Sequence, residues 1–232
     1  MTVPGLRQLF PVAGAVDPEQ AYAVPADRPW LRANMVATLD GAVTAPDGRS
    51  ATISSDADRA LFATMRRLAD VVLVGAGTAR TEGYRPARLP IALVTARLDL
   101  DLTSPLLATP EHRTIVLTAG SAGTDRIRAA EEVADVVVCG DDHVDLVVAV
   151  AALRERGLQH VLCEGGPTLL GWVAARGLLD ELCLTMSPLL VGGGNLPRIL
   201  GGPALPSTLR LELAHLLESD GTLFSRYLVR RT

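Results

Sequence analysis

The sequence of 232 residues is poor in aromatic side chains, in cysteine and in histidine. Aromatic residues make up only 3% of the chain, whereas 48% of it is hydrophobic, mostly Leu, Val and Ala. Aliphatic content of this kind is typical of helices that pack on a buried sheet. Low hydrophobicity combined with high charge, the signature of disorder, is absent, so we expect a folded domain.

The scarcity of cysteine and histidine leaves little material for a metal site. Cys139, Cys163 and Cys183 all lie in apolar runs, and no two of them have the spacing of metal ligands. The four histidines are isolated along the chain. We therefore expect buried, reduced thiols and no metal.

The chain also lacks an excess of basic residues and a long apolar run. The net charge of −4 and a pI near 5.6 argue against nucleic acid as a partner. We expect the arginines Arg226, Arg230 and Arg231 to form a solvated edge. No apolar run is long enough to cross a bilayer. The segment "LFPVAGAV" is short and broken by Pro11, so we expect no signal peptide and a cytoplasmic protein.

Apolar runs alternate with helical patterns from about residue 30 onward. Strands are expected within residues 30–39, 71–78, 89–96, 113–120, 135–140, 159–166 and 181–194, and helices within 54–70, 124–134, 145–157 and 167–177. Such alternation predicts a mainly parallel sheet flanked by helices. A predicted antiparallel hairpin at residues 209–231 makes the sheet mixed. We expect one domain over residues 29–232, after an N-terminal arm or irregular lead of residues 1–28.

The helix expected within residues 54–70 has the clearest local signal. Ser55 followed by Asp58 is a capping-box pattern, which marks the start of a helix. Leu61, Met65 and Leu68 then fall on one face, which predicts that this face is buried.

Three glycine-bearing segments follow predicted strands: "VGAGTAR", "CEGGPTLL" and "SPLLVGGG". Ligands of open α/β sheets bind beyond the carboxyl ends of the strands, where glycines admit a close approach and helix N-termini attract phosphate. Any one of these turns alone is better explained as an ordinary connection. The usual dinucleotide fingerprint, the P-loop, the nucleophile elbow and the zinc-deaminase motif are all absent.

Three carboxylates stand beside predicted turns: Asp40 in "TLDG", Glu82 after "GAGT", and Glu164 at the end of a strand. An acid in such a place can bind a polar ring or transfer a proton. A turn-forming role explains Asp40 about equally well, and plain solvent exposure is favoured for Glu82. Glu164 is the most informative, because it lies between an apolar run and two glycines.

Four ordered blocks carry a family resemblance: "ANMVATLDG", "ISSDADRALFATMRRLADVVLVGAGTAR", "LVTARLDLDLTSPLL" and the stretch from "VDLVVAV" to "SPLLVGG". Together they resemble the pyrimidine reductase domain of riboflavin biosynthesis, the 5-amino-6-(5-phosphoribosylamino)uracil reductase family. The resemblance covers most of the chain from about residue 30. It implies a dihydrofolate-reductase-like fold, here without the deaminase domain that is often fused to this one.

The resemblance also implies an enzyme that transfers hydride from NADPH to C1′ of a ribosylamino-pyrimidine, an imine-type substrate. Glu164 and Asp40 match the family's acids, and Glu82 is a further catalytic candidate. Thr95 and Arg97 occupy the place that reads the adenosine 2′-phosphate. Such enzymes are typically homodimers, and "GLLDELCLTMSPLL" is a candidate interface, although core packing explains it equally well. The remaining cofactor-binding candidates are Ser54, Val74, Gly75, Gly77, Thr78, Gly165, Gly166 and Thr168.

Two departures from the family pattern fall on the substrate side. Ala42 stands where the family commonly has Lys, and "TEGYRP" stands where it commonly has an Asp-Asp-Pro segment. Both departures therefore bear on the identity of the substrate and leave the cofactor turns intact. The alternatives are a reductase of a related heterocycle such as dihydrofolate, or a non-catalytic paralogue that binds NADPH.

Overall fold

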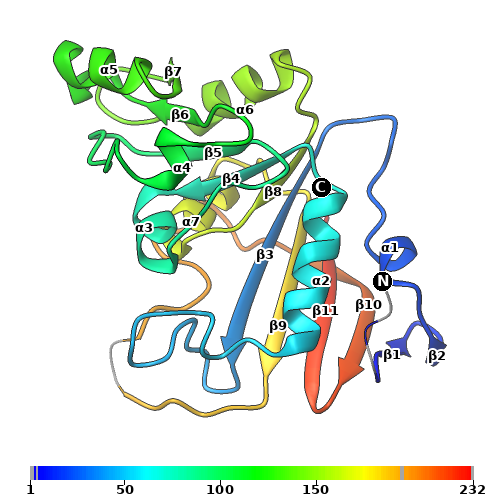
Figure 1. The fold of residues 1–232 in the computed structure, drawn as a ribbon. Helices are drawn as coiled ribbons and strands as arrows, with labels where there is room; N and C mark the ends of the chain where they lie inside the picture. The colour runs from blue at the N-terminus through cyan, green and yellow to red at the C-terminus, as the bar shows by residue number, and fades with distance from the viewer. Residues whose placement is uncertain (1–2, 4, 194–195, 231–232) are drawn as a thin grey trace.

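The computed structural model describes residues 3, 5–193 and 196–230. Within them, the chain forms an eleven-stranded sheet in the order β2-β1-β10-β11-β9-β3-β8-β4-β5-β6-β7 (Figure 1). The strands are β1 (Arg7–Phe10), β2 (Gly14–Ala15), β3 (Trp30–Thr38), β4 (Val71–Gly75), β5 (Ile91–Val94), β6 (Ile115–Thr118), β7 (Asp135–Val138), β8 (His160–Cys163), β9 (Glu181–Ser187), β10 (Leu211–Ser219) and β11 (Thr222–Val229).

The sheet has a parallel part and an antiparallel part. Strands β9, β3, β8, β4, β5, β6 and β7 pair in parallel. Strands β10 and β11 form an antiparallel hairpin that joins the sheet at β9. The predicted mixed, mainly parallel α/β sheet with a C-terminal hairpin is thereby confirmed.

Successive side chains of a strand point to opposite faces of the sheet. Because the strands here carry apolar residues on both faces, helices cover both of them. Leu31 and Val161 pack with residues of α6 and α7. Leu162 and Cys183 pack with Leu61 of α2. The helices are α1 (Pro18–Ala21), α2 (Asp56–Arg67), α3 (Ala76–Glu82), α4 (Pro105–Ala108), α5 (Thr124–Glu131), α6 (Leu146–Glu155) and α7 (Pro167–Ala175), and Gly120–Ala122 forms one 3₁₀ turn.

Local signals in the sequence located α2 well. The Ser55 hydroxyl caps the helix by accepting a hydrogen bond from the Asp58 amide, and Leu61 and Met65 are buried as predicted. The prediction of a glycine turn after β4 is wrong in detail. The strand passes directly into α3, with Gly75 as N-cap and Gly77 inside the first turn.

The N-terminal lead, expected as an arm or irregular surface, contains two strands and a short helix. Strand β1 pairs with β10 and so extends the antiparallel edge of the sheet. Strands of four and two residues are too short to show a recognisable alternation. Tyr22, immediately after α1, is buried in the core beneath α2.

A buried ionic cluster holds this lead against the sheet. Glu181 accepts hydrogen bonds from Arg32 (2.6 Å), Arg226 (2.8 Å) and Trp30 (2.9 Å). Arg226 also donates to the backbone oxygens of Ala21 and Ala23 in the lead, and Arg32 to that of Tyr22. The expected solvated edge is therefore wrong for Arg226. Arg230 is exposed and pairs with Glu212, and Arg231 lies outside the described residues.

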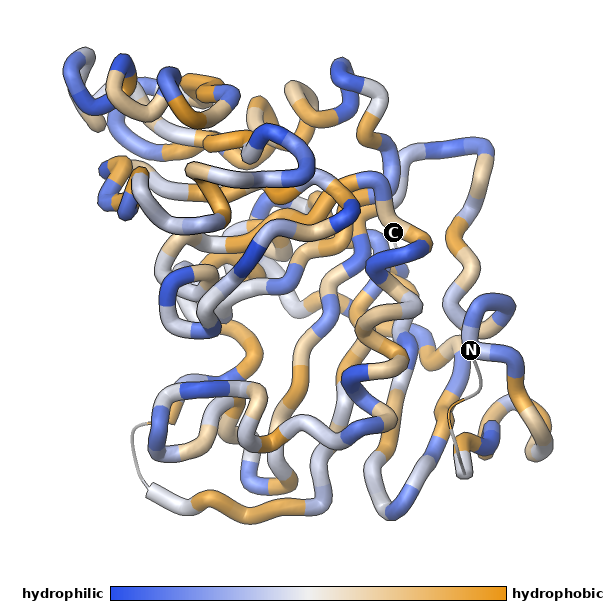
Figure 2. The backbone as a smooth tube through the Cα atoms, viewed as in Figure 1, coloured by the Kyte–Doolittle hydropathy of each residue, from blue (hydrophilic) through white to orange (hydrophobic). Residues whose placement is uncertain are grey.

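The three cysteines are buried and free, as predicted. In the part of the chain that the structure describes, each helix is too short or too polar to span a bilayer. Some apolar residues are nevertheless exposed. Leu189 and Leu190, just after β9, are 44% and 76% exposed, and Figure 2 shows this segment as an orange stretch along the lower edge.

Candidate functional site

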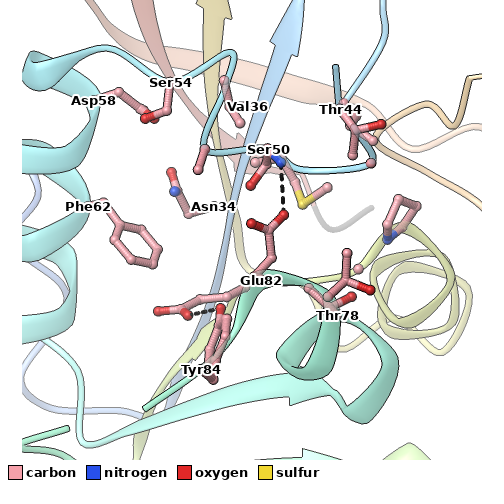
Figure 3. A pocket seen from close by; sticks show the side chains of 18 of the residues that line it. Asn34, Val36, Thr44, Ser50, Ser54, Asp58, Phe62, Thr78, Glu82 and Tyr84 are labelled. Carbon is pink, nitrogen blue, oxygen red and sulfur yellow. Dashed lines mark hydrogen bonds between the residues drawn. The ribbon is translucent and has the colours of Figure 1, made fainter. Parts of the chain in front are cut away.

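A cavity of about 540 Å³ lies between α2, α3 and the carboxyl half of β3. We call it the α2–α3 cavity (Figure 3). Helix α2 contributes Asp58, Phe62 and Arg66 to its wall, and β3 contributes Asn34. Glu82, Tyr84 and Glu164 also belong to the polar part of the lining.

Glu164 is held by two partners within this cavity wall. Arg66 donates to both carboxylate oxygens at 2.7 Å, which is the bidentate geometry of a strong ion pair. The Tyr84 hydroxyl donates to the same carboxylate. The Glu164 side chain is only 2% exposed, whereas that of Arg66 is 26% exposed. Both residues line the cavity, and Arg66 is the more exposed member of this charged pair.

Two aromatic rings keep the Arg66 guanidinium in place. It lies 4.6 Å from the ring centre of Phe62 and 5.5 Å from that of Tyr84. Burial opposes the charge of Arg66, but the bond to Glu164 raises its pKa, so it stays a cation. Burial, and next the charge of Glu164, raise the pKa of Tyr84 well above its usual range, so its hydroxyl stays a donor. No local sequence pattern marks Arg66 as a site residue, and Tyr84 stands out only as part of a departure from the family pattern.

Asp58 is a second buried carboxylate in the same cavity. It is 7% exposed and accepts one hydrogen bond from Ser54 and one from Thr185, both at 2.6 Å. Burial raises the pKa of its carboxyl group. Because Asp58 was interpreted only as part of a helix cap, the sequence did not identify it as a site residue.

The other two predicted acids lie in different surroundings. Glu82 lines the α2–α3 cavity and accepts a hydrogen bond from the Ser50 amide at 2.8 Å (Figure 3). Asp40 is exposed and is not part of the lining. Its carboxylate accepts hydrogen bonds from the Thr38 hydroxyl and from the amides of Val191 and Gly192. The Thr38 hydroxyl and then the Gly192 amide lower its pKa.

A second cavity of about 410 Å³, the α3–α7 cavity, continues from the first. Its wall includes Thr95 and Thr168, both predicted to bind cofactor, and also His143 and Trp172. The residues shared by both cavities are Gly77, Thr78, Gly166 and Pro167. The two cavities therefore adjoin at the beginnings of α3 and α7, and we call the pair the cleft.

Most of the predicted cofactor residues meet along this cleft. Gly75, Gly77, Thr78, Thr95, Gly166 and Thr168 line the α3–α7 cavity, and Ser54 lines the α2–α3 cavity. Gly165 lies beside them and accepts a hydrogen bond from the Gly75 amide at 2.8 Å. Two candidates lie apart. Val74 is fully buried in a core cluster, and Arg97 is exposed and belongs to neither lining.

The junction of the two cavities fits a dinucleotide. Both α3 and α7 begin at glycine N-caps without a capping side chain, and uncapped helix amides attract phosphate. In α7 the first such amide is that of Thr168, because Pro167 has no N–H. A Cβ at position 166 would lie 2.5 Å from the Thr78 hydroxyl, so any other residue there would displace that side chain from the junction. The Gly165–Gly166 peptide is cis. The chain thus presents free amides and a hydroxyl at one narrow point.

Comparison with known proteins gives the family. The model of the family described as the RibD C-terminal domain matches residues 29–224. A 2,5-diamino-6-ribosylamino-4(3H)-pyrimidinone 5′-phosphate reductase of Archaeoglobus fulgidus is 27% identical over 203 residues, which are 80% of this chain and 92% of the relative. The enzyme of that name from Methanothermobacter thermautotrophicus is also 27% identical, over 88% of this chain and 99% of its own.

A solved structure is similar over nearly the whole chain. It is a pyrimidine reductase-like protein from Corynebacterium diphtheriae, 29% identical with a TM-score of 0.82, and the match covers 94% of this chain and 100% of that one. As the resemblance predicted, this chain belongs to the RibD C-terminal domain family.

Proposed function

We propose that this chain is an NADPH-dependent reductase of riboflavin biosynthesis. It would reduce C1′ of the ribosylamino group of 2,5-diamino-6-ribosylamino-4(3H)-pyrimidinone 5′-phosphate, the compound in its relatives' names. The observation that carries the proposal is the pair of adjoining cavities that make up the cleft. One end has free helix amides and mostly aliphatic walls, and the other has Glu164, Asp58 and Glu82.

The proposed cofactor site is the α3–α7 cavity and its junction with the α2–α3 cavity. When bound there, NADPH supplies the hydride. Glycines 75, 77 and 166, with Thr78 and Thr168, would hold its phosphates. Holding both reactants in one cleft converts the encounter into a reaction between fixed partners, which is the main contribution of the protein.

Thr95 and Arg97 are the proposed readers of the 2′-phosphate. Thr95 lines the α3–α7 cavity, and the exposed Arg97 follows two residues later. We expect Arg97→Ala to weaken NADPH by about 1.5–3 kcal/mol, the range for a hydrogen bond to a charged group. Calorimetric titration should find NADH affinity almost unchanged. An equal loss for both cofactors would mean that Arg97 does not read the phosphate.

The α2–α3 cavity favours a substrate edge that donates hydrogen bonds. Asp58 uses one lone pair on each oxygen for Ser54 and Thr185, so each oxygen can still accept. Within the described residues, Oδ1 of Asn34 is buried without a partner. A 2-amino-pyrimidinone presents an amino group and a ring N–H side by side, which a carboxylate can bind together. The deaminated uracil presents a carbonyl in place of that amino group, which a carboxylate repels.

The predicted acids take different parts in this proposal. Glu164 orients Arg66 and Tyr84 at the substrate end, and Glu82 faces the same space. Asp40 would act through the loop that it binds, because its carboxylate is engaged with the Val191 and Gly192 amides. Asp40 is then a positioning residue, while Ala42 is buried outside the lining.

Loss of NADPH absorbance with three substrates tests the proposal: the diamino-pyrimidinone, its deaminated uracil counterpart and dihydrofolate. We expect turnover of the first to exceed that of the others. Turnover of dihydrofolate alone would establish the related-heterocycle alternative. Tight NADPH binding without turnover of any substrate would establish a non-catalytic paralogue.

Asp58→Asn tests whether the Asp58 carboxylate selects the diamino-pyrimidinone over the deaminated uracil. It should lower kcat/KM for the diamino substrate about 10- to 100-fold, with a smaller effect on the uracil, because the lost bonds are charge-assisted. Asp56→Asn is the matched control on the same helix, since Asp56 is 97% exposed and outside the cavity. Equal losses for both substrates would remove Asp58 from the selectivity.

We further infer a cytoplasmic homodimer. Three buried free thiols are compatible with a reducing compartment. Much of the predicted interface segment is buried in the monomer core, but Leu189 and Leu190 at its end are exposed. Light scattering of Leu190→Glu beside the unaltered chain tests whether this end contributes to a dimer.

A further inference from the structure

Trp172 is an exposed tryptophan in the wall of the α3–α7 cavity. The chain has two tryptophans. Trp30 is 6% exposed and donates a hydrogen bond to Glu181 in the buried ionic cluster. Trp172 is 40% exposed. An aromatic-poor chain thus leaves one of its largest rings uncovered within the cleft.

Helix α7 directs this ring into the cavity. Trp172 follows Thr168 by four residues, so the two side chains lie on one helix face, and both line the cavity. The neighbouring Gly171 packs against the chain, where a Cβ would lie 1.8 Å from the Gly201 oxygen. This contact fixes the helix against residues 201–202 and leaves the Trp172 side toward the cleft.

The Trp172 ring is supported as well as exposed. The guanidinium carbon of Arg176 lies 5.6 Å from the ring centre. A Cβ at position 202 would lie 3.6 Å from Cδ1 of Trp172, so the loop backbone packs along one edge of the ring. A ring held in this way loses little conformational freedom when a ligand stacks on it.

The rest of the cavity suits a flat, weakly polar ligand. Val94, Val144, Leu146 and Leu169 give it aliphatic walls, and Thr95 and His143 add polar groups. The free amides of α7 begin one turn before Trp172. A heterocyclic base joined to phosphate matches this arrangement of apolar walls and nearby amides.

We propose that Trp172 is the surface on which the adenine base of the dinucleotide stacks. This inference rests on the proposed function, because it assigns one end of the same cofactor. Every base offers a π face to an aromatic ring, and the contact is strong enough to matter for affinity. The nicotinamide end would then extend past Gly166 toward the α2–α3 cavity.

Tryptophan fluorescence reports on this contact directly. Titration with adenosine 2′,5′-bisphosphate, which lacks the nicotinamide half, should quench the emission of the wild-type chain. Trp172→Phe should abolish that quenching, because the remaining Trp30 is buried away from the cleft. Quenching that persists in Trp172→Phe would overturn the proposal.

Calorimetry separates the adenine contact from the rest of the cofactor. Trp172→Leu should weaken NADPH and the bisphosphate about 10-fold, and Trp172→Phe less, because phenylalanine still stacks. Reduced nicotinamide mononucleotide, which has no adenine, should bind all variants equally. Phe10→Leu is the control, since Phe10 is 42% exposed on β1 and outside both linings.

The failures are distinguishable. If the wild-type chain binds NADPH and Trp172→Leu binds it equally well, the adenine assignment is wrong and the proposed function stands. If the wild-type chain binds neither NADPH nor the bisphosphate, the proposed function and this inference both fall.

Discussion

Two buried glutamates of this protein form ion pairs with arginine, and their surroundings differ. Glu181, the first residue of β9, is 0% exposed, and its partners Arg32 and Arg226 bind the backbone of the N-terminal lead. Glu164, just after β8, is almost as buried, but its partner Arg66 is 26% exposed in the α2–α3 cavity.

The difference follows from the two ends of the strands. Glu181 stands at the start of a parallel strand, and the N-terminal lead covers it there. Glu164 stands at the carboxyl end, where connections to helices leave a cleft. Burial opposes the ionisation of Glu181, but Arg32 and Arg226 outweigh it and lower its pKa. A buried glutamate paired with arginine thus holds the N-terminal lead in place at the start of β9, whereas the same kind of pair forms part of the cavity wall at the end of β8.

Glu181→Gln should produce the largest effect. It leaves two buried arginines without their charge partner, which costs about 3–5 kcal/mol of unfolding free energy. Chemical denaturation measures this loss, and NADPH binding by the folded fraction should be unchanged. Glu212→Gln is the control, because its pair with Arg230 is exposed and should contribute at most about 1 kcal/mol. A loss of stability as small as that of Glu212→Gln would contradict the claim that the buried ionic cluster stabilises the fold.

Glu164→Gln should affect turnover more than stability. We expect kcat to fall about 100-fold, because Arg66 and Tyr84 would no longer be held in position beside the substrate. Arg66 can be hydrated from the cavity, so the unfolding free energy should fall less than in Glu181→Gln. Cofactor affinity should be nearly unchanged in a direct NADPH titration. A large loss of cofactor binding would refute a substrate-side role for Glu164.

His215 should make the stability of the buried ionic cluster around Glu181 sensitive to acid. Its ring contacts Tyr22, and burial, followed by the charge of Arg226, lowers the pKa of His215 to about 4. An unfolded histidine titrates near 6.5, so the unfolded chain binds the extra proton first as the pH falls. The contribution of His215 to the free energy of unfolding is therefore fully present above about pH 6.5. It decreases by roughly 2–3 kcal/mol as the pH falls toward 4.

Denaturation of His215→Gln at several pH values tests this expectation. Its stability should change less between pH 6.5 and 4 than that of the unaltered chain, even if it is lower throughout. The same slope in both proteins would show that other groups cause the acid sensitivity.

Tyr84→Phe should give the smallest change. It removes one of three hydrogen bonds to Glu164 and leaves both bonds from Arg66. We expect kcat/KM to fall about 10-fold, corresponding to roughly 1.5 kcal/mol for a bond to a charged group. NADPH affinity should not change. A loss as large as in Glu164→Gln would mean that Tyr84 contacts the substrate itself.

Local patterns in the sequence were sufficient for most of the strands and longer helices and for half of the cleft. The alternation of apolar runs and helical stretches predicted the mixed sheet, and Ser55 predicted the start of α2. Gly166 and Thr168 were identifiable because close approach and helix N-termini depend on residues that are adjacent in the chain. The short strands of the N-terminal lead gave no comparable pattern.

The substrate end of the cleft was decided by tertiary structure. Arg66 and Glu164 are separated by 98 residues, and Asp58 and Thr185 by 127. Such partners meet only because the sheet order places β9, β3 and β8 side by side beneath α2. An arginine on a helix has the same local sequence whether it faces water or a buried acid. The sequence by itself therefore determined strands β3 to β11, helices α2, α5, α6 and α7 and the glycine-rich segments, and only the fold decided which charges face the cavity.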